Sequence, residues 1–382
     1  MNSLIMNLWK ILKQKQKQIK GDIFMAKLKL EDIEAPIDVI FKQRVAQMIA
    51  VGEKGVVLFA HRNETLANKD ADADTDAKTY ILRDFTSSLN TGIEDESLKQ
   101  KVVDIFDGGA VEVLLLEHAN DLETYVDVLN EIHFDWCVSD NAKDQTTIAT
   151  YAVEKELFAV GYNVAKDNMS VVNFTNPKVT KKDGTVVEAL DYLPKIAGVL
   201  AGCPYSKSVS YKVFTDLQSV TMPEVEKGAL ILKNDEDGVR FASPVNSLIT
   251  LGTNITEDMK SICIVEGMRR LMKDVKYAYK NSYKGNYKNH YDNQCLLITA
   301  IKAFLKELAK REILDPSYDN TCDVDIATQR EKWIASGKDE AEINALSDQE
   351  IRELTYKDMV FLKLDVKFLN AMEGLQATVE MF

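Results

Sequence analysis

Residues that bind metals or carry nucleophilic chemistry are scarce in this chain. Its 382 residues include four histidines and five cysteines, and no pair of cysteines has C-x-x-C spacing. No histidine has a second histidine or a cysteine at the spacing of a zinc site. Widely spaced cysteines in odd number are typical of small buried side chains in a reducing compartment, and they argue against a disulfide framework. We therefore expect no metal site and no cofactor.

Long apolar runs and an excess of positive charge are missing as well. No apolar run approaches the roughly 20 residues that span a membrane. The net charge is −13, whereas nucleic-acid binding requires a basic surface. We therefore expect neither a membrane nor nucleic acid as a partner. The hydrophobic and charged fractions, 46% and 28%, are those of an ordinary folded protein.

Sequence motifs of enzymes and of ion-binding loops are also absent. Neither G-x-S-x-G nor G-x-x-x-x-G-K-[ST] occurs. The run Asp70–Asp76 resembles a calcium loop, but Thr75 and Ile81 stand where such a loop needs glycine and glutamate. Gly198 and Gly202 belong to a helical pattern and do not follow a strand, which predicts close packing instead of phosphate binding. We accordingly expect no catalytic residues.

The strongest pattern lies at the C-terminal end. Apolar and polar residues alternate from Val360 to Phe368, and after a break at 370–374 they alternate again. Period-two alternation predicts half-buried β-strands. A strand at a chain end needs a sheet to join, either in the same chain or in a neighbouring one. The two apolar faces are Leu362, Leu364, Val366 and Phe368, and then Leu375, Ala377, Val379 and Met381.

Strand and helix patterns alternate in the middle of the chain, which predicts an α/β layer with a largely parallel sheet. Strands are predicted at 111–116, 134–138 and 169–174, helices at 121–132 and 145–160, and hairpins at 178–188 and around 235–238. The hairpins follow from Lys182-Asp183-Gly184 and from the turn that ends at Gly238.

The whole chain is predicted to be a multidomain protein of the α+β and α/β classes. A small β-rich N-terminal domain precedes the α/β middle domain, and a helical C-terminal domain is closed by β-strands. The expected boundaries are 1–24 for an upstream segment or arm, 25–45 for an N-terminal arm, 46–97 for the β-rich segment, 98–235 for the α/β domain and 236–382 for the C-terminal domain.

The first 24 residues have two interpretations. Codons for Lys20-Gly21-Asp22 can spell a bacterial ribosome-binding sequence just ahead of Met25. The hypothesis is that the native protein begins at Met25 and that the preceding residues are translated upstream DNA. The alternative is a short amphipathic helix that serves as an arm.

A run of lysines interleaved with tyrosines is the one basic feature that stands out. Lys276, Lys280, Lys284 and Lys288 recur at every fourth position. Such a run could bind single-stranded nucleic acid. In so acidic a chain we favour an exposed basic ridge that pairs with an acidic protein surface.

Several segments together resemble the sheath proteins of contractile tails, a family found in myophages of low-GC Gram-positive bacteria, in R-type tailocins and in defective prophages. Residues 197–204 match the family's A-G-x-x-A-G-x-P helix, which precedes the strand 208–214. Residues 266–274 match its long helix. Tyr283-Lys-Gly285 matches its Y-x-G-K-x-x-N turn, except that Asn286 replaces the lysine, and 296–301 match the helix that follows. The resemblance extends over nearly the whole chain from about Pro36.

This resemblance implies a structural protein that is not an enzyme. Sheath subunits form six-fold rings, stacked helically around a tail tube, and contraction drives the tube through the target cell envelope. The implied partners are further copies of the chain, the tail tube protein, and the baseplate and tail terminator proteins. The implied location is the tail of a virion or tailocin, assembled in the bacterial cytoplasm.

The family also exchanges strands between subunits through its terminal arms. Transferred to this sequence, the donated strands are Ile37, Val39 and Phe41 at the N-terminus and Leu375, Ala377, Val379 and Met381 at the C-terminus. The acceptor sheet carries Leu362, Leu364, Val366 and Phe368, and the basic ridge faces the tube or a neighbouring subunit.

Two other functions stay open from the sequence. One is an α/β enzyme with a pocket near the carboxyl ends of the strands 111–116 and 134–138. Its candidate polar residues are Glu117, His118 and Asp140. The other is a different self-assembling shell or tube protein with swapped termini.

Overall fold

The computed structural model describes residues 55–63, 77–83, 95–224 and 227–381, together with Leu66 and Ile93. These residues all belong to one compact unit, Met48–Phe382. The expectations for residues 1–24, for the arm 25–45 with Ile37, Val39 and Phe41, and for the acidic run 70–76 lie outside the described residues.

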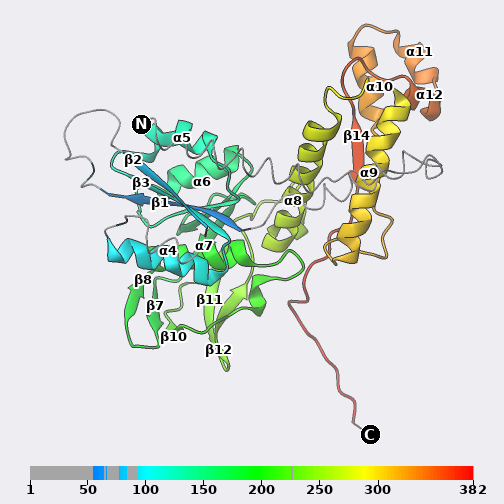
Figure 1. The fold of residues 1–382 in the computed structure, drawn as a ribbon. Helices are drawn as coiled ribbons and strands as arrows, with labels where there is room; N and C mark the ends of the chain where they lie inside the picture. Colours follow the sequence, from blue (N-terminus) through cyan, green and yellow to red (C-terminus); the bar gives the residue numbers. More distant parts are fainter. Residues whose placement is uncertain are drawn as a thin grey trace, which may run out of the picture. The chain divides into compact units, whose positions relative to one another are not determined.

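A nine-stranded sheet with the order β2-β3-β1-β4-β5-β6-β11-β12-β9 forms the centre of the α/β part (Figure 1). The strands β3, β1, β4, β5, β6 and β11 run parallel to one another, whereas β2, β12 and β9 are antiparallel to their neighbours. The sheet is therefore mixed, with a parallel centre. Its strands are β1 (Val56–Arg62), β2 (Ala77–Leu82), β3 (Glu112–His118), β4 (Trp136–Ser139), β5 (Phe158–Tyr162), β6 (Val171–Phe174), β9 (Val213–Phe214), β11 (Ala229–Asp235) and β12 (Gly238–Ser243).

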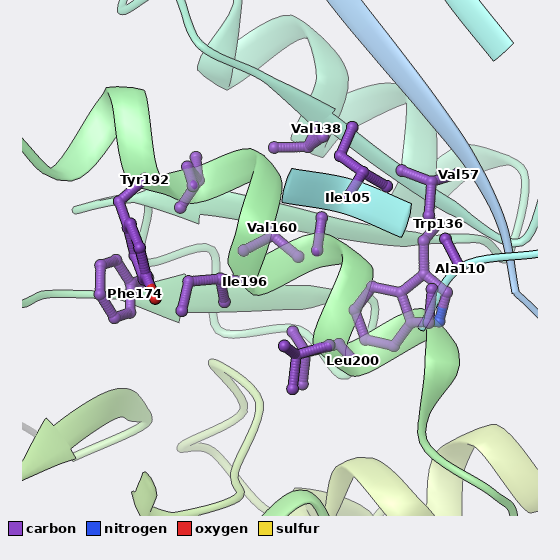
Figure 2. Packing of buried hydrophobic residues seen from close by; sticks show 14 of the residues in the cluster. Val57, Ile105, Ala110, Trp136, Val138, Val160, Phe174, Tyr192, Ile196 and Leu200 are labelled. Atoms are coloured by element: carbon purple, nitrogen blue, oxygen red, sulfur yellow. The ribbon is translucent and has the colours of Figure 1, made fainter. Parts of the chain in front are cut away.

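Helices cover both faces of this sheet because its strands present apolar side chains alternately to either side. The helices α4 (Glu96–Gly108) and α7 (Ala189–Gly202) pack on one face, where Trp136 and Val160 meet Ile105 and Leu200 (Figure 2). The turn η3 (Leu122–Tyr125) and the helices α5 (Val126–Glu131) and α6 (Gln145–Glu154) pack on the other face.

The crossing of α4 and α7 depends on glycines. A Cβ atom at Gly198 would lie 2.2 Å from the carbonyl oxygen of Ile105, and one at Gly202 would lie 2.5 Å from the carbonyl carbon of Gly109. Real Cβ contacts are never this short, so only glycine lets the two backbones approach as they do. The expectation of close packing at Gly198 and Gly202 is confirmed.

Replacing Gly198 by alanine is expected to lower the free energy of unfolding by about 3 kcal/mol, because α4 must move away from α7 to admit the methyl group. Urea unfolding of the dilute protein measures the change. Gly252→Ala is the matched control, since no atom lies within 4 Å of its Cβ position. Equal stability of the two variants would contradict the tight crossing.

Three sequence expectations are wrong. The segment 46–97 is not a separate β-rich domain, because β1 lies between β3 and β4 in the central sheet. The boundary at 235/236 also falls inside the hairpin of β11 and β12, whose strands are paired. Finally, the helix expected at 145–160 ends at Glu154, and residues 158–162 form β5.

A second sheet and the helical C-terminal region complete the described chain. The predicted hairpin at 178–188 is confirmed as β7 (Lys178–Lys181) and β8 (Val186–Glu188), which join β10 (Leu217–Val220). The remaining elements are η4 (Val209–Tyr211), η5 (Glu257–Lys260), α8 (Ile262–Ala278), η6 (Tyr279–Tyr283), α9 (Tyr291–Lys310), β13 (Thr321–Val324), α10 (Ile326–Ala335), α11 (Glu340–Ala345), α12 (Asp348–Glu353) and β14 (Leu362–Asp365). None of the helices in the described ranges has both the length and the apolar character to cross a membrane.

Helix α8 joins the C-terminal region to the central sheet through polar contacts. Trp136 Nε1 of β4 donates to Glu266 Oε1 at 3.1 Å. The Arg269 guanidinium donates to the carbonyl of Leu157 at 2.7 Å and lies over the ring of Phe158, 4.1 Å from its centroid. Because these donors and acceptors satisfy each other away from water, they fix the helix to β4 and β5.

Candidate functional site

The strands β13 and β14 form a small antiparallel sheet in which Cys322 faces Leu364 and Val324 faces Leu362. Leu362, Leu364, Val366 and Phe368 are half-buried, and the intervening Lys363, Asp365 and Lys367 are exposed. The predicted alternation of 360–368 is thus confirmed. The two-residue period arises because this short sheet has one face packed on the protein and one in water.

The pairing continues beyond β14 towards the C-terminus. Leu314 and Phe368 form a bridge, and the Lys367 carbonyl accepts from the Asp315 amide at 2.8 Å. Lys367 Nζ also lies 2.9 Å from Asp315 Oδ2. Hydrogen bonds from Ser317 and from Lys367 lower the pKa of Asp315 to about 2, so this pair stays ionised well into the acid range. The ring of Phe368 lies against α8 at Gly267, where a Cβ atom would be 3.1 Å from Cδ1.

The backbone of 361–369 presents one open edge. The carbonyls of Phe361 and Lys367 accept bonds from Asp325 and Asp315, and the amide of Leu369 donates to Ile313. The backbone N–H and C=O groups of odd-numbered residues therefore point towards the 313–325 segment. Because backbone groups alternate along an antiparallel strand, the amides and carbonyls of 362, 364, 366 and 368 point the other way. Within the described residues these groups have no backbone partner.

The C-terminal segment that follows is apolar yet exposed. Residues 370–381 form neither helix nor strand, and Figure 1 draws them as a trace that leaves the helical region. Leu375 is 93% exposed, Val379 82% and Met381 92%. Glu373 Oε1 accepts a 3.1 Å hydrogen bond from Ser210 Oγ, close to a cavity of about 470 Å³ at the root of the segment. The segment therefore has the side-chain pattern of a strand but no sheet to join within the described residues.

The predicted basic ridge spans three local structures. Lys276 lies on α8, Lys280 in the π-helical turn η6, and Lys284 and Lys288 in the loop before α9. All four side chains are exposed. Lys276 Nζ is 3.6 Å from Glu156 Oε2. No ion pair forms at the other three within the described part of the chain.

The three residues proposed for an enzyme site do lie at one edge of the sheet. Glu117 Oε2 accepts from Asn63 at 2.9 Å. The His118 ring is fully buried, with Nδ1 2.9 Å from the carbonyl of Asn120 and Nε2 3.4 Å from Asp144 Oδ2. Asp140 Oδ2 lies 2.8 Å from both His61 Nδ1 and Lys101 Nζ.

Several members of this polar edge could not be identified from sequence motifs. Arg62 lies 2.8 Å from Asp144 and 3.0 Å from Asp121, while Lys101 bridges Asp140 and Asp191. Their only sequence signal is that His61 and Arg62 end a buried strand. Each charge is paired with a residue from another element, so the network fastens β1, β3 and β4 to the helices around them.

The ionisation of Asp140 gives this network a pH dependence. Burial alone would raise the pKa of Asp140, but the hydrogen bond from His61 and the charge of Lys101 outweigh it and hold the pKa below its ordinary value. A carboxylate with a lowered pKa in the folded state contributes stability above its unfolded pKa, near 4, and loses that contribution as the pH falls through the folded value.

Asp140→Asn is therefore expected to be less stable than the parent at pH 7, by a margin that shrinks as the pH falls below about 4. Urea unfolding from pH 7 to pH 3 measures the margin. Glu154→Gln is the control, because Glu154 is exposed on α6 and forms no ion pair within the described residues. A margin that stays constant with pH would show that Asp140 is not held by these charges.

Comparison with known sequences identifies relatives of the whole chain. Residues 255–382 match the family described as "Phage tail sheath C-terminal domain". The chain is also 26% identical over 362 residues to the tail sheath protein of Clostridium phage phiCD119, covering 90% of this chain and 98% of that protein.

Solved structures with this fold come from several contractile systems. A sheath tail protein from Listeria innocua superimposes with a TM-score of 0.59 at 13% identity, over 76% of this chain and 93% of that one. The contracted PVC sheath of an extracellular contractile injection system gives 0.60 at 13% identity, over 86% and 92%. The contracted helical sheath of the anti-feeding prophage gives 0.58 at 12% identity, over 86% and 94%. At these identities the likeness shows the fold.

Proposed function

The chain belongs to the contractile tail sheath family and is a structural sheath subunit, and we propose that it polymerises by donating its C-terminal segment to the open edge of the sheet in a neighbouring copy. The proposal rests on two features of the same chain, the exposed alternating segment 375–381 and the unfilled strand edge at 362–368. The donor lacks a sheet and the edge lacks a strand, so copies of the chain complete each other.

The register of the exchange follows from the direction of the backbone groups. An added strand meets the amides and carbonyls of Leu362, Leu364, Val366 and Phe368, which point away from β13. Leu375, Val379 and Met381 then leave water for the apolar face of the extended sheet. Each copy both donates and accepts, so the contact is heterologous and propagates around a closed ring or along a helix.

The finer architecture is proposed on the same basis. The subunits form six-fold rings stacked helically around a tail tube, with the N-terminal arm at Ile37, Val39 and Phe41 as a second donated strand. The tail tube, baseplate and tail terminator proteins are the other partners, in a phage tail or tailocin that assembles in the host cytoplasm. Related sheath and baseplate complexes of injection systems support an oligomeric tail component of this kind.

Contraction is proposed to be a rigid-body rearrangement between two packings of the subunits. The exchanged strands act as hinges that keep neighbouring copies linked while their other contacts change. The contacts of Trp136 with Glu266 and of Arg269 with the Leu157 carbonyl lie within one subunit and are expected to persist in both packings.

Size-exclusion chromatography and negative-stain microscopy of the purified chain test the proposal. Striated tubes or stacked rings at high concentration are the expected result. A species that remains monomeric at all concentrations would favour the enzyme alternative. Closed shells would favour the third alternative, a different self-assembling protein with swapped termini.

A further inference from the structure

The C-terminal region carries two surfaces of opposite charge. The stretch from Val275 to Tyr291 has four lysines and no aspartate or glutamate. The stretch from Asp339 to Glu353 has six acidic residues and one arginine, and that Arg352 is bound to Asp323 at 2.9 Å. We call the first surface the basic ridge and the second, on α11 and α12, the acidic lobe. A protein with net charge −13 gains solubility from acids anywhere on its surface, but the acid-free ridge has no such explanation.

Three of the four lysines of the ridge are unpaired. Lys280, Lys284 and Lys288 are exposed and have no ion pair within the described residues. Beside them Met272 and Tyr277 are 49% and 48% exposed on α8. Exposed aromatic and methionine side chains next to unpaired cations are the composition of a protein-binding surface.

The acidic lobe presents matching charges. Glu340 and Glu342 are exposed on α11 and form no ion pair in the part of the chain that the structure describes. The lobe is held rigid from inside, since the Arg330 guanidinium donates to the carbonyls of Ile343 and Leu346, both at 2.7 Å. The backbone that carries these carboxylates is therefore held before any partner arrives.

The end of the ridge is held in place in the same way. Asn289 Nδ2 donates to the carbonyls of Tyr356, Lys357 and Met359 at 3.3, 3.0 and 3.0 Å. Because hydrogen bonds within the subunit hold the backbone of both surfaces, little backbone conformational entropy is lost when they meet a partner.

We propose that the basic ridge of one copy docks on the acidic lobe of a neighbouring copy in the polymer. The inference rests on the proposed function, because it requires copies of the chain to lie side by side. Charge complementarity between two different surfaces of one chain makes the contact heterologous, as polymer growth requires. The ridge is thereby assigned to a neighbouring subunit and not to the tube.

Charge reversal tests the assignment. Lys280→Glu with Lys284→Glu gives a ridge variant, and Glu340→Lys with Glu342→Lys gives a lobe variant. Each alone is expected to raise the critical concentration for assembly about tenfold, because like charges then face each other. An equimolar mixture of the two is expected to restore assembly, since each reversed surface meets its complement on the other variant. Lys143→Glu with Lys155→Glu, exposed positions of the α/β part, controls for the change in net charge.

The outcomes separate this inference from the proposed function. If the parent chain forms tubes but both variants assemble like the parent, the ridge–lobe contact alone is overturned. The same holds if the parent forms tubes and the mixture of variants shows no rescue. If only the ridge variant fails to assemble, and it also no longer binds tube protein or nucleic acid, the ridge is assigned to that partner instead. Failure of the parent chain to assemble at all would overturn the proposed function first.

Discussion

Deleting residues 371–382 is expected to abolish tube formation and to leave the subunit folded. The deleted segment has no strand partner among the described residues, and its side chains Met372, Leu375, Val379 and Met381 are almost fully exposed. Its removal therefore costs the isolated subunit little more than the exposed bond between Ser210 and Glu373. Negative-stain microscopy measures the assembly, and thermal unfolding of the dilute protein measures the fold.

The size of this effect follows from the number of repeated contacts. Burying four apolar side chains of one donated strand contributes roughly 6–12 kcal/mol before costs, and ordering about seven residues costs on the order of 7–14 kcal/mol. One exchange is marginal by itself. Repetition around a ring makes the exchanges cumulative, so losing the C-terminal donor from every subunit is expected to remove the polymer. Replacing Glu373 by alanine, which removes the same bond and keeps the donor, is the control, and tubes from the truncated chain would contradict the proposal.

Val366→Pro is expected to block assembly almost as completely without removing any donor. The amide of Val366 points to the open edge and has no partner within the described residues. Proline removes this donor and places its ring where the incoming strand lies. The binding free energy lost at every contact between subunits is about 1–3 kcal/mol. Tube formation by microscopy and the critical concentration by sedimentation measure it.

Two further variants isolate the edge effect. Val366→Ala removes the same apolar side chain but keeps the amide, and is expected to assemble at a modestly higher concentration. Lys363→Pro acts on a residue that points towards β13, and is expected to lower the stability of the dilute subunit instead. Normal assembly of Val366→Pro, with Lys363→Pro also harmless, would show that the open edge accepts no strand.

Local patterns in the sequence predict those elements whose causes are local. The hairpin turn at Lys182-Asp183-Gly184 and the alternation of 360–368 depend on neighbouring residues only, and both are present. The end of α6 could not be found in this way. Glu156 takes a left-handed φ of 57° where glycine is usual, so no residue type announces the turn into β5.

Contacts between distant segments were beyond local patterns. The place of β1 between β3 and β4 depends on the pairing of Val57 with Val113 on one side and with Trp136 on the other, which no local spacing reveals. At the candidate site, the apolar face at 362–368 was predictable from alternation. Which edge of the small sheet is open was not, because it depends on hydrogen bonds from Asp315 and Asp325, some 50 and 36 residues away.

The contacts of α8 determine where mechanical tension enters the α/β part. Phe368 lies on Gly267, and the adjacent Glu266 is bonded to Trp136 of β4. A pull on the exchanged strands is therefore transmitted to a strand with neighbours on both sides. Such a strand separates only when two rows of backbone bonds break together, whereas a strand at the rim peels from one. In the proposed polymer, the force of contraction would therefore act on a strand that is held from both sides.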